Sequence, residues 1–471
     1  MRIHSRAISG CLVAIMGVLM APLARADLYT AVAAYEKKDH VRAFELFREL
    51  AELGHPLAQE TLAIMYVMGE GVKRDNVAGY AWAQIAQETN PRAKVQPIIE
   101  QIQNSLSPDA RAKVDQIRNK FGRQALEAQL LPLPRGGAGE EEARSPSEPV
   151  QPTCRTTEPV NTGDYYPEGA IRAGVSGSVF IATTVLPDGR ARNPRALLSL
   201  PPNGFDLAGR SVAFDSTYKV PIVDGVAVPC TVTFWVRFAL RPADTERVLK
   251  TQLDKLKTDV TAGDPQAQMQ YALLKTGWVN LNRENENIAP LLIEAAQAGL
   301  PTAQFSVGLY ALAGLYVTRD RAKGLRWLEL AANKGHHDAE VTLATELLRA
   351  RPDAADVARA RGLLEKAVAG DHVSARYFLS DLLLEAGSAP ADPRRSLELL
   401  GDVMKYVEQD PTAFEIRAAA LSQTGDFGAA VAAQKRALAR ARKLHWDVAP
   451  QEERLALYSK NQPWTRRLVD Y

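Results

Sequence analysis

Four short stretches of this 471-residue chain share one pattern: LGHPLAQ at 53–59, AGDPQAQ at 262–268, AGLPTAQ at 298–304 and KGHHDAE at 334–340. In each stretch a glycine is followed, four residues later, by an alanine. The glycines Gly263, Gly299 and Gly335 recur at a period of 36 residues, and a fourth copy places Gly370 a further 35 residues on. A fixed period of this length is typical of solenoids built from stacked helical hairpins.

The chemistry of each repeat supports a helix, a tight turn and a second helix. The segment before the glycine is amphipathic, as in GLRWLELAANKG at 324–335, whose apolar residues return at helical spacing. We expect the glycine to end the helix in a left-handed conformation, and a proline or polar residue to start the next one. The alanine is expected where two helices approach closely.

Two histidines in the last of these stretches raise the question of a metal site. His336 and His337 stand beside acidic residues, and imidazole and carboxylate are both zinc ligands. The position of His336 is occupied by Leu300 and Asp264 in the sister repeats. A position that accepts leucine or aspartate belongs to a turn, so we expect a structural turn, side chains that point to solvent, and no bound metal.

The segment Tyr35–Gln87 resembles the Sel-one-like repeats, a subfamily of the tetratricopeptide-type (TPR-type) helical hairpins. Its most specific feature is the loop YVMGEGV at 66–72. The loop is degenerate in the copies within 262–390, and Pro411–Lys443 matches an ordinary TPR hairpin. The resemblance implies protein–protein interaction on a curved helical surface and no catalytic chemistry. The matching N-terminal residues are Ala51, Gly54, Ala58, Gln59, Leu62, Met65, Tyr66, Gly69, Glu70, Gly71, Val72, Asp75, Ala78, Trp82 and Ala86.

A region of different composition separates the two helical arrays. Residues 131–153 are rich in Pro, Gly, Ser and Glu, which predicts a flexible linker. After it, SVFIATTV at 178–185 alternates as a strand does, and PDG at 187–189 predicts a hairpin turn. A second strand is expected over roughly 190–200, a helix within 203–214 and a long strand at 228–240. The order is β-β-α-β.

That order and its residues resemble the TonB C-terminal domain over about 165–240. The chain departs from the family's Trp-x-Phe motif, because Tyr218 replaces the tryptophan and Val220 the phenylalanine. In the family, the last strand has a free edge that pairs with an extended peptide of an outer-membrane receptor. The matching residues are Tyr166, Pro167, Ala170, Gly174, Gly177, Val179, Val185, Asp188, Gly189, Phe205, Asp206, Pro221, Gly225, Val228 and Phe238.

The resemblance places the candidate peptide-binding edge on the strand 230–238. An alternative is that a helical array covers this edge. We expect Thr231, Thr233, Trp235 and Arg237 on one face of the strand, and Val232, Phe234, Val236 and Phe238 on the other. Of the three cysteines, Cys11 lies in the segment that is predicted to be a cleavable signal, so cleavage leaves Cys154 and Cys230. We expect this even pair to form a disulfide in an oxidising compartment.

The N-terminus predicts export. Basic residues precede the apolar segment 8–20, and Ala24-Arg25-Ala26 fits a signal-peptidase site, so cleavage after Ala26 would leave a periplasmic protein. The alternative is an uncleaved segment that anchors the chain in the inner membrane, facing the periplasm. A net charge of +2 gives no global reason to expect a nucleic-acid partner.

The sequence therefore predicts a multidomain protein of helical solenoid repeats with a small α+β domain between them. No nucleophile motif, phosphate loop or metal-ligand spacing is present, so we expect no enzyme activity, no cofactor and no small-molecule substrate. The favoured function is a periplasmic interaction or scaffold protein, and the alternative is a TonB-type energy transducer. The expected regions are a signal peptide at 1–26, Sel-one-like repeats at 27–130, the linker at 131–153, the TonB-like domain at 154–242 and C-terminal repeats at 250–471.

Overall fold

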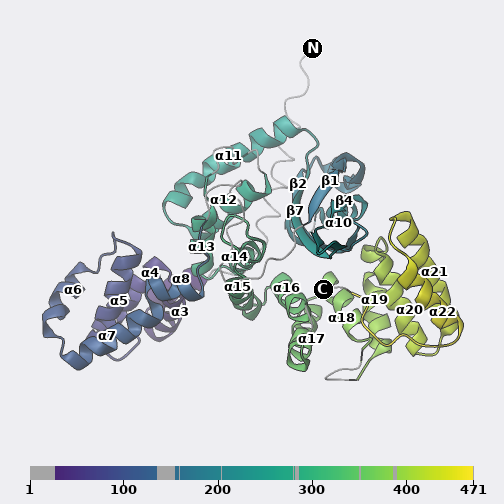
Figure 1. The fold of residues 1–471 in the computed structure, drawn as a ribbon. Coiled ribbons are helices and arrows are strands. Elements are labelled where there is room, and N and C mark those ends of the chain that lie inside the picture. The colour runs from purple at the N-terminus through teal and green to yellow at the C-terminus, as the bar shows by residue number, and fades with distance from the viewer. Residues whose placement is uncertain are drawn as a thin grey trace, which may run out of the picture. The chain divides into compact units, whose positions relative to one another are not determined.

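The computed structural model describes residues 27–134, 154–158, 160–202, 204–278, 281, 286–349, 352–385 and 390–469 (Figure 1). The predicted signal peptide and residues 135–153 of the predicted linker lie outside the described residues. The described residues divide into two compact units. One unit holds the segments within 154–247 and 337–469, and the other holds those within 27–134 and 248–336.

The unit made of 27–134 and 248–336 is helical in its described residues. Its first segment carries α2 (Asp27–Glu36), α3 (His40–Glu52), α4 (Pro56–Met68), α5 (Asn76–Thr89), α6 (Gln96–Ile102), the 3-10 helix η1 (Gln103–Ser105), α7 (Pro108–Phe121) and α8 (Arg123–Gln129). Its second segment carries α12 (Pro265–Gly277), α13 (Ala289–Gln297), α14 (Pro301–Ala313) and α15 (Arg321–Asn333). The helix α11 (Pro242–Thr261) includes the boundary between the two units.

The repeat turns have the predicted conformation. Gly54, Gly263, Gly299 and Gly335 all have positive φ angles, between 77° and 92°, which is the left-handed region that glycine adopts at low cost. The alanine four residues after each of these glycines is at most 4% exposed, since it lies where helices pack closely. The prediction of helical hairpins is therefore confirmed at its most local level.

The fourth repeat turn differs from the prediction. Gly370 has a φ of −85°, and the left-handed residue is Asp371, with a φ of 65°. This copy has one residue more before its alanine, which moves the left-handed position one residue along the chain. A Cβ at 370 would lie 2.0 Å from Nε2 of His337, so a larger residue there would require the His337 ring to move.

Two segments far apart in the sequence meet inside this helical unit. The amide of Leu28 donates to the carbonyl of Ala298 at 3.2 Å, and the side-chain amide of Gln297 donates to the carbonyl of Leu53 at 3.0 Å. Ala298 belongs to the same buried cluster as the N-terminal helices α2–α5. The N-terminal repeats are therefore packed against the turn between α13 and α14.

The first residues assigned to the linker are not free. The amide of Thr318 donates to the carbonyl of Leu133 at 2.8 Å, and Pro134 forms an isolated β-bridge with Val317. Just before them, the indole N–H of Trp327 donates to the carbonyl of Leu130 at 2.9 Å. Composition alone could not reveal these contacts, because their partners lie almost two hundred residues away.

The other unit combines a small α+β domain, here called the β module (154–242), with the C-terminal repeats α16–α22. The β module contains β1 (Arg155–Glu158), η2 (Thr162–Tyr165), α9 (Glu168–Ala173), β2 (Gly177–Val185), β3 (Ala191–Leu200), α10 (Asp206–Asp215), β4 (Thr217–Lys219), β5 (Ile222–Val223), β6 (Val226–Ala227) and β7 (Cys230–Phe238). The repeats are α16 (His337–Leu348), α17 (Ala354–Ala369), α18 (Val373–Leu382), α19 (Pro393–Val407), α20 (Pro411–Gln423), α21 (Phe427–Lys443) and α22 (Ala449–Ser459).

The central sheet of the β module has the strand order β3-β2-β7, and both pairings are antiparallel. The helix α10 packs on one face, where a Cβ on Gly209 would lie within 3.0–3.2 Å of Ile181 and Val179. The predicted β-β-α-β order is confirmed, with β2, β3, α10 and β7 as its members. The short pairs β1–β4 and β5–β6 were not predicted, because each strand is only two to four residues long.

Candidate protein-interaction site

The strand β7 lies at an edge of the three-stranded sheet. Its nine residues pair with β2 without a break in register, from Gly177 opposite Phe238 to Val185 opposite Cys230. Within the described residues, no strand pairs with the outer side of β7. This edge therefore has the regular backbone spacing that an added antiparallel or parallel strand requires.

The side chains of β7 alternate between two environments. Phe234, Val236 and Phe238 pack with α10 in the main core of the β module. On the opposite face, the ring of Trp235 lies 5.2 Å from that of Phe180. The predicted assignment of the two faces agrees with this arrangement, and most of the strand is half-buried.

A disulfide joins Cys154 to Cys230 at the start of β7, with a Cα–Cα distance of 5.7 Å. Both cysteines are buried in a small second core together with Tyr218. Tyr218, which replaces the tryptophan of the TonB pattern, donates its hydroxyl hydrogen to the carbonyl of Ala213 at 3.0 Å. The bond ties the segment before β1 to the sheet, and a disulfide fits an oxidising compartment.

The other edge strand, β3, is irregular. Its pairing with β2 shifts twice, between Phe180 and Ile181 and again between Ala182 and Thr184. The second shift coincides with Asn193, whose φ is 49°, followed by Pro194. Bulges and proline interrupt the ladder of backbone donors, so β3 is a poor template for a further strand.

The C-terminal repeats hold β3 through buried polar groups. The hydroxyl oxygen of Tyr377 lies 3.1 Å from Oδ1 of Asn193 and 3.0 Å from Oδ2 of Asp410. Burial raises the pKa of the Asp410 carboxyl, and the positive charge of Arg210 opposes that rise. Arg210 itself donates to the carbonyls of Pro194 and, in the repeats, of Tyr406. Within this unit the repeats therefore hold β3 through specific hydrogen bonds.

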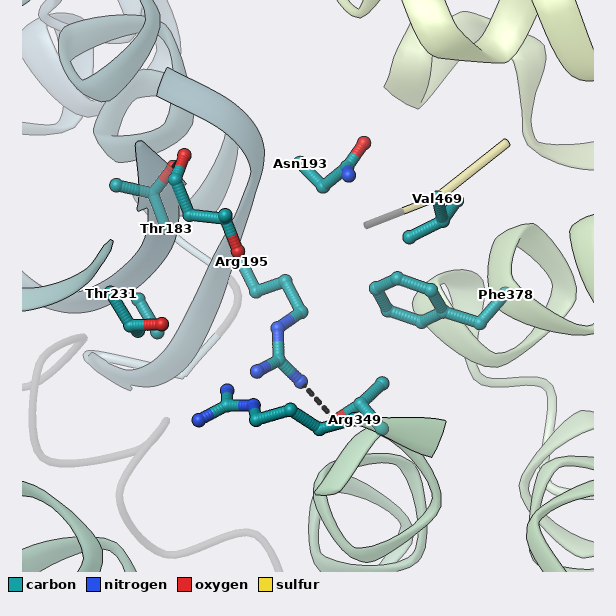
Figure 2. Close-up of a pocket in the computed structure, with 10 residues that line it drawn as sticks. Thr183, Asn193, Arg195, Thr231, Arg349, Phe378 and Val469 are labelled. Carbon is teal, nitrogen blue, oxygen red and sulfur yellow. Dashed lines mark hydrogen bonds between the residues drawn. The ribbon is translucent and has the colours of Figure 1, made fainter. Parts of the chain in front are cut away.

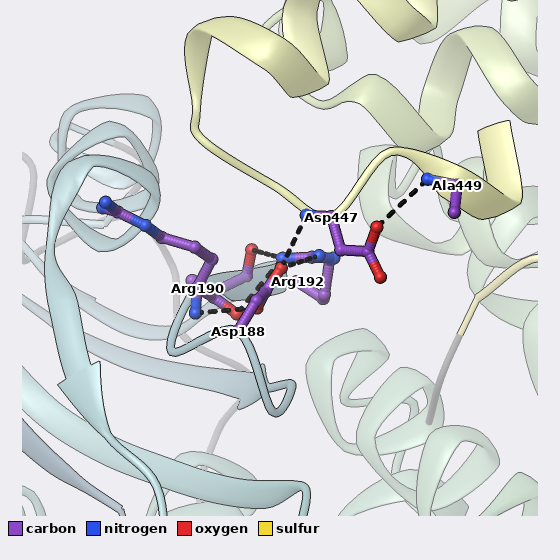
Figure 3. A network of polar contacts seen from close by, with 6 residues as sticks. Asp188, Arg190, Arg192, Asp447 and Ala449 are labelled. Atoms are coloured by element: carbon purple, nitrogen blue, oxygen red, sulfur yellow. Dashed lines mark hydrogen bonds and ion pairs between the residues drawn. The ribbon is translucent and has the colours of Figure 1, made fainter. Parts of the chain in front are cut away.

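The hairpin turn between β2 and β3 makes a second contact with the repeats (Figure 3). Asp188 pairs with Arg192 at 2.6 Å and accepts a hydrogen bond from the amide of Asp447 at 3.1 Å. The guanidinium of Arg192 lies 3.6 Å from the ring centre of Trp446, which is a cation–π arrangement. Both charges are thus satisfied at the contact, so the turn is fixed in place.

One predicted edge residue, Thr231, lines a small cavity between the β module and the repeats (Figure 2). The cavity has a volume of about 20 Å³, which is room for about one water molecule. Arg195 crosses it to donate to the hydroxyl of Thr345 at 2.5 Å. The cavity is too small for a ligand and belongs to the packing of the two parts.

The histidines of the 334–340 stretch have structural partners. The ring of His336 stacks on Phe305 at 4.7 Å, and Nδ1 of His337 lies 2.9 Å from a carboxylate oxygen of Glu340. His336 is half-buried, so the expectation that it points to solvent was wrong, whereas the side chain of His337 is 40% exposed. Across the described residues, no group of three His, Cys, Asp or Glu side chains has an arrangement that could hold a metal ion.

Three residues that fix the β module, Asn193, Tyr377 and Asp410, were not predicted from the sequence. The signal available was the Asn-Pro dipeptide inside a predicted strand, which indicates an edge strand or a bulge.

In the part of the chain that the structure describes, no helix has the length and apolarity needed to cross a membrane.

These features define a helical-repeat protein that carries a small α+β module. Residues 163–240 match the family model of the Gram-negative bacterial TonB protein C-terminal. The Sel1 repeat model matches at 34–55, 56–86, 301–336 and 373–401. The chain thus has a TonB C-terminal domain flanked by Sel1 repeats, and both matched families are non-catalytic domains that imply protein partners.

Three solved structures resemble parts of the fold. A Sel1 repeat protein from Oxalobacter formigenes is 17% identical, with a TM-score of 0.34, over 46% of this chain and 98% of its own. A protective antigen of uropathogenic Escherichia coli strains with an SLR fold is 14% identical, with a TM-score of 0.28, over 92% and 82%. Yeast Tom70 is 12% identical, with a TM-score of 0.27, over 93% and 81%. A comparison with curated proteins found no match.

Proposed function

We propose that this chain is a periplasmic interaction protein whose β module binds an extended peptide segment of a partner by strand addition to β7. The partner segment fits a short extended stretch of an outer-membrane receptor, as the TonB resemblance implies. The helical repeats hold the β module and offer further surfaces to other proteins, so that the chain acts as a scaffold.

The difference between the two sheet edges is the observation that carries this proposal. β7 has nine residues in unbroken register, whereas β3 has two shifts, a proline and a left-handed asparagine. The repeats of the same unit contact β3 through Tyr377. The backbone donors and acceptors of β7 are therefore regularly spaced for pairing with an extended peptide, whereas those of β3 are not.

The disulfide between Cys154 and Cys230 supports the periplasmic part of the proposal, because such bonds persist in oxidising compartments. N-terminal sequencing of a tagged chain from fractionated cells tests it. A periplasmic product that begins at Asp27 is the expected result. A full-length product in the inner membrane would instead favour the energy transducer.

Site-specific photo-crosslinking in cells tests the β7 edge. A photoreactive residue at Thr233 is expected to form adducts with a small set of outer-membrane proteins. The matched control carries the same residue at Val226, which is 63% exposed on the β5–β6 hairpin of the same module. Equal adducts from both positions, or none from Thr233, would count against strand addition at β7.

A further inference from the structure

The last described residues of the chain, Gln462–Val469, follow α22 without forming a helix or strand and fold back over the C-terminal repeats. We call them the tail. Buried and half-buried side chains of the repeats bind the main chain of the tail. Binding through main-chain hydrogen bonds is typical of peptide-binding grooves, because such bonds form whatever side chains the peptide carries.

Asp381 binds the end of the tail. Its Oδ1 accepts hydrogen bonds from the amides of Leu468 at 2.7 Å and Val469 at 3.3 Å. Asp381 belongs to α18 and is fully buried. A charged acceptor that takes two adjacent main-chain donors fixes both the position and the direction of the tail.

α20 binds the start of the tail in the same way. The side-chain amide of Gln423 donates to the carbonyl of Trp464 at 2.8 Å and also to the carbonyl of Leu384 at 2.8 Å. The hydroxyl of Ser422 accepts from the amide of Trp464 at 3.3 Å. Both main-chain groups of one tail residue are thus bound by neighbouring side chains of a single helix.

Side chains of the tail add selectivity at fixed positions. Trp464 and Leu468 pack against the apolar core of the repeats, and Val469 is part of that core. Arg467 pairs with Glu385 at 3.0 Å. The pattern is an aromatic residue, then, after two positions, an arginine and two aliphatic residues. Val469 also lines the cavity beside Phe378, where the repeats meet the β module (Figure 2).

We propose that the surface of α18 and α20 that binds the tail is a peptide-binding groove, and that the tail is its resident competitor. The groove fits an extended segment of a partner protein with the pattern aromatic-x-x-Arg-aliphatic-aliphatic. The groove is formed by the repeats and uses no hydrogen bond of β7, so it goes beyond the function proposed above and stands without it, although Val469 and Thr231 line the same small cavity. A partner segment must displace the tail, which makes binding to the repeats self-regulated.

The expected size of the competition follows from tethering. A short tether holds its segment at a local concentration of about 1 mM. If the tail sequence binds as a free peptide with a Kd of about 0.1 mM, the attached tail weakens binding of that peptide about tenfold. Substitutions that weaken binding of the attached tail should restore the affinity for the free peptide by about the same tenfold.

The test uses a fluorescein-labelled peptide with the sequence of 461–469, NQPWTRRLV, and measures its anisotropy against the full chain. The full chain with Trp464→Ala and Arg467→Ala is expected to bind it about tenfold more tightly than the unchanged chain. Adding Gln423→Ala to that variant removes a groove contact and should abolish the gain. A scrambled peptide is the control for unspecific binding.

The proposal is overturned if the tail variant keeps its circular dichroism spectrum and still binds the peptide no better than the unchanged chain. Should the tail variant fail to fold, hydrogen exchange of the unchanged chain decides. The amides of Leu468 and Val469 should exchange much faster than those of α20, and equal rates would make the tail a permanent part of the core.

Discussion

Replacement of both cysteines by alanine should loosen the β module without affecting the N-terminal repeats. Cys154 and Cys230 are 76 residues apart in the sequence. A cross-link that closes a loop of this length removes chain entropy from the unfolded state worth about 4.5 kcal/mol at 25 °C. Measured effects are usually lower, so a loss of about 2 to 4.5 kcal/mol is expected for opening of the sheet.

Hydrogen exchange read by mass spectrometry is the suitable assay, because it reports each part of the chain separately. Amides of β2 and β7 should exchange about 30-fold to about 2,000-fold faster in the variant, which is the same free energy expressed as a rate. Peptides from α4 and α5 are the internal control and should not change. In the unreduced protein, an alkylating reagent should label neither cysteine.

An unchanged exchange rate in β2 and β7 would refute the reasoning. It would mean either that the bond does not form in solution or that residues 154–158 contribute nothing to the sheet. Alkylation of both cysteines in the unreduced protein would select the first explanation. A uniform acceleration that includes α4 and α5 would mean that the loss is global and not confined to the β module.

Three further changes test other parts of the structure. The side chains of Arg454 and Glu415 form a buried ion pair at 2.7 Å, so Arg454→Met leaves the Glu415 carboxylate without its partner and should lower the free energy of unfolding in urea by about 3 to 5 kcal/mol. Adding Glu415→Leu should restore most of that loss, and a loss below about 1 kcal/mol in the single variant would contradict the buried pair. Burial lowers the pKa of His55 from 6.5 to about 4, so the folded protein favours the neutral imidazole ring. Up to about 3 kcal/mol of folding stability that is present above pH 6.5 should be lost as the pH falls to 4. His55→Asn keeps a side-chain helix cap and should make stability depend less on pH over this range. Gly335→Ala should lower the free energy of unfolding by only about 1 to 2 kcal/mol, because its one penalty is the positive φ. Gly71→Ala should lower it clearly more, because the added Cβ would also lie 1.9 Å from a backbone oxygen. Equal melting temperatures for the two variants would contradict this difference.

The repeats could be predicted because their signals are local. The left-handed residue after a helix is most often glycine, and Gly263, Gly299 and Gly335 mark three turns by themselves. The same reasoning fails at Gly370, where one additional residue moves the left-handed position to Asp371. Gly370 lies against the ring of His337 instead, and a contact between two turns has no local signal.

The strands of the β module were predicted for a similar reason. Alternation of apolar and polar residues follows from the pleat, so β2 and β7 could be found from their own residues. β1 and β4 are too short to carry a pattern, and they become visible only when Arg155 meets Lys219 across 64 positions of the chain. The candidate edge came from the family resemblance, since alternation does not reveal the order of strands in a sheet.

The sequence by itself determined the classes of structure in this protein: helical hairpins with left-handed glycine turns, and a sheet of alternating strands with one helix. These properties depend on backbone geometry and on neighbours a few residues away. The tertiary structure decided which sheet edge the repeats hold, and that the tail binds between α18 and α20. Those outcomes depend on contacts such as the one between Asn193 and Tyr377, 184 positions apart. Such contacts form only where folding brings two surfaces of matching shape and polarity together, and no local propensity encodes that match.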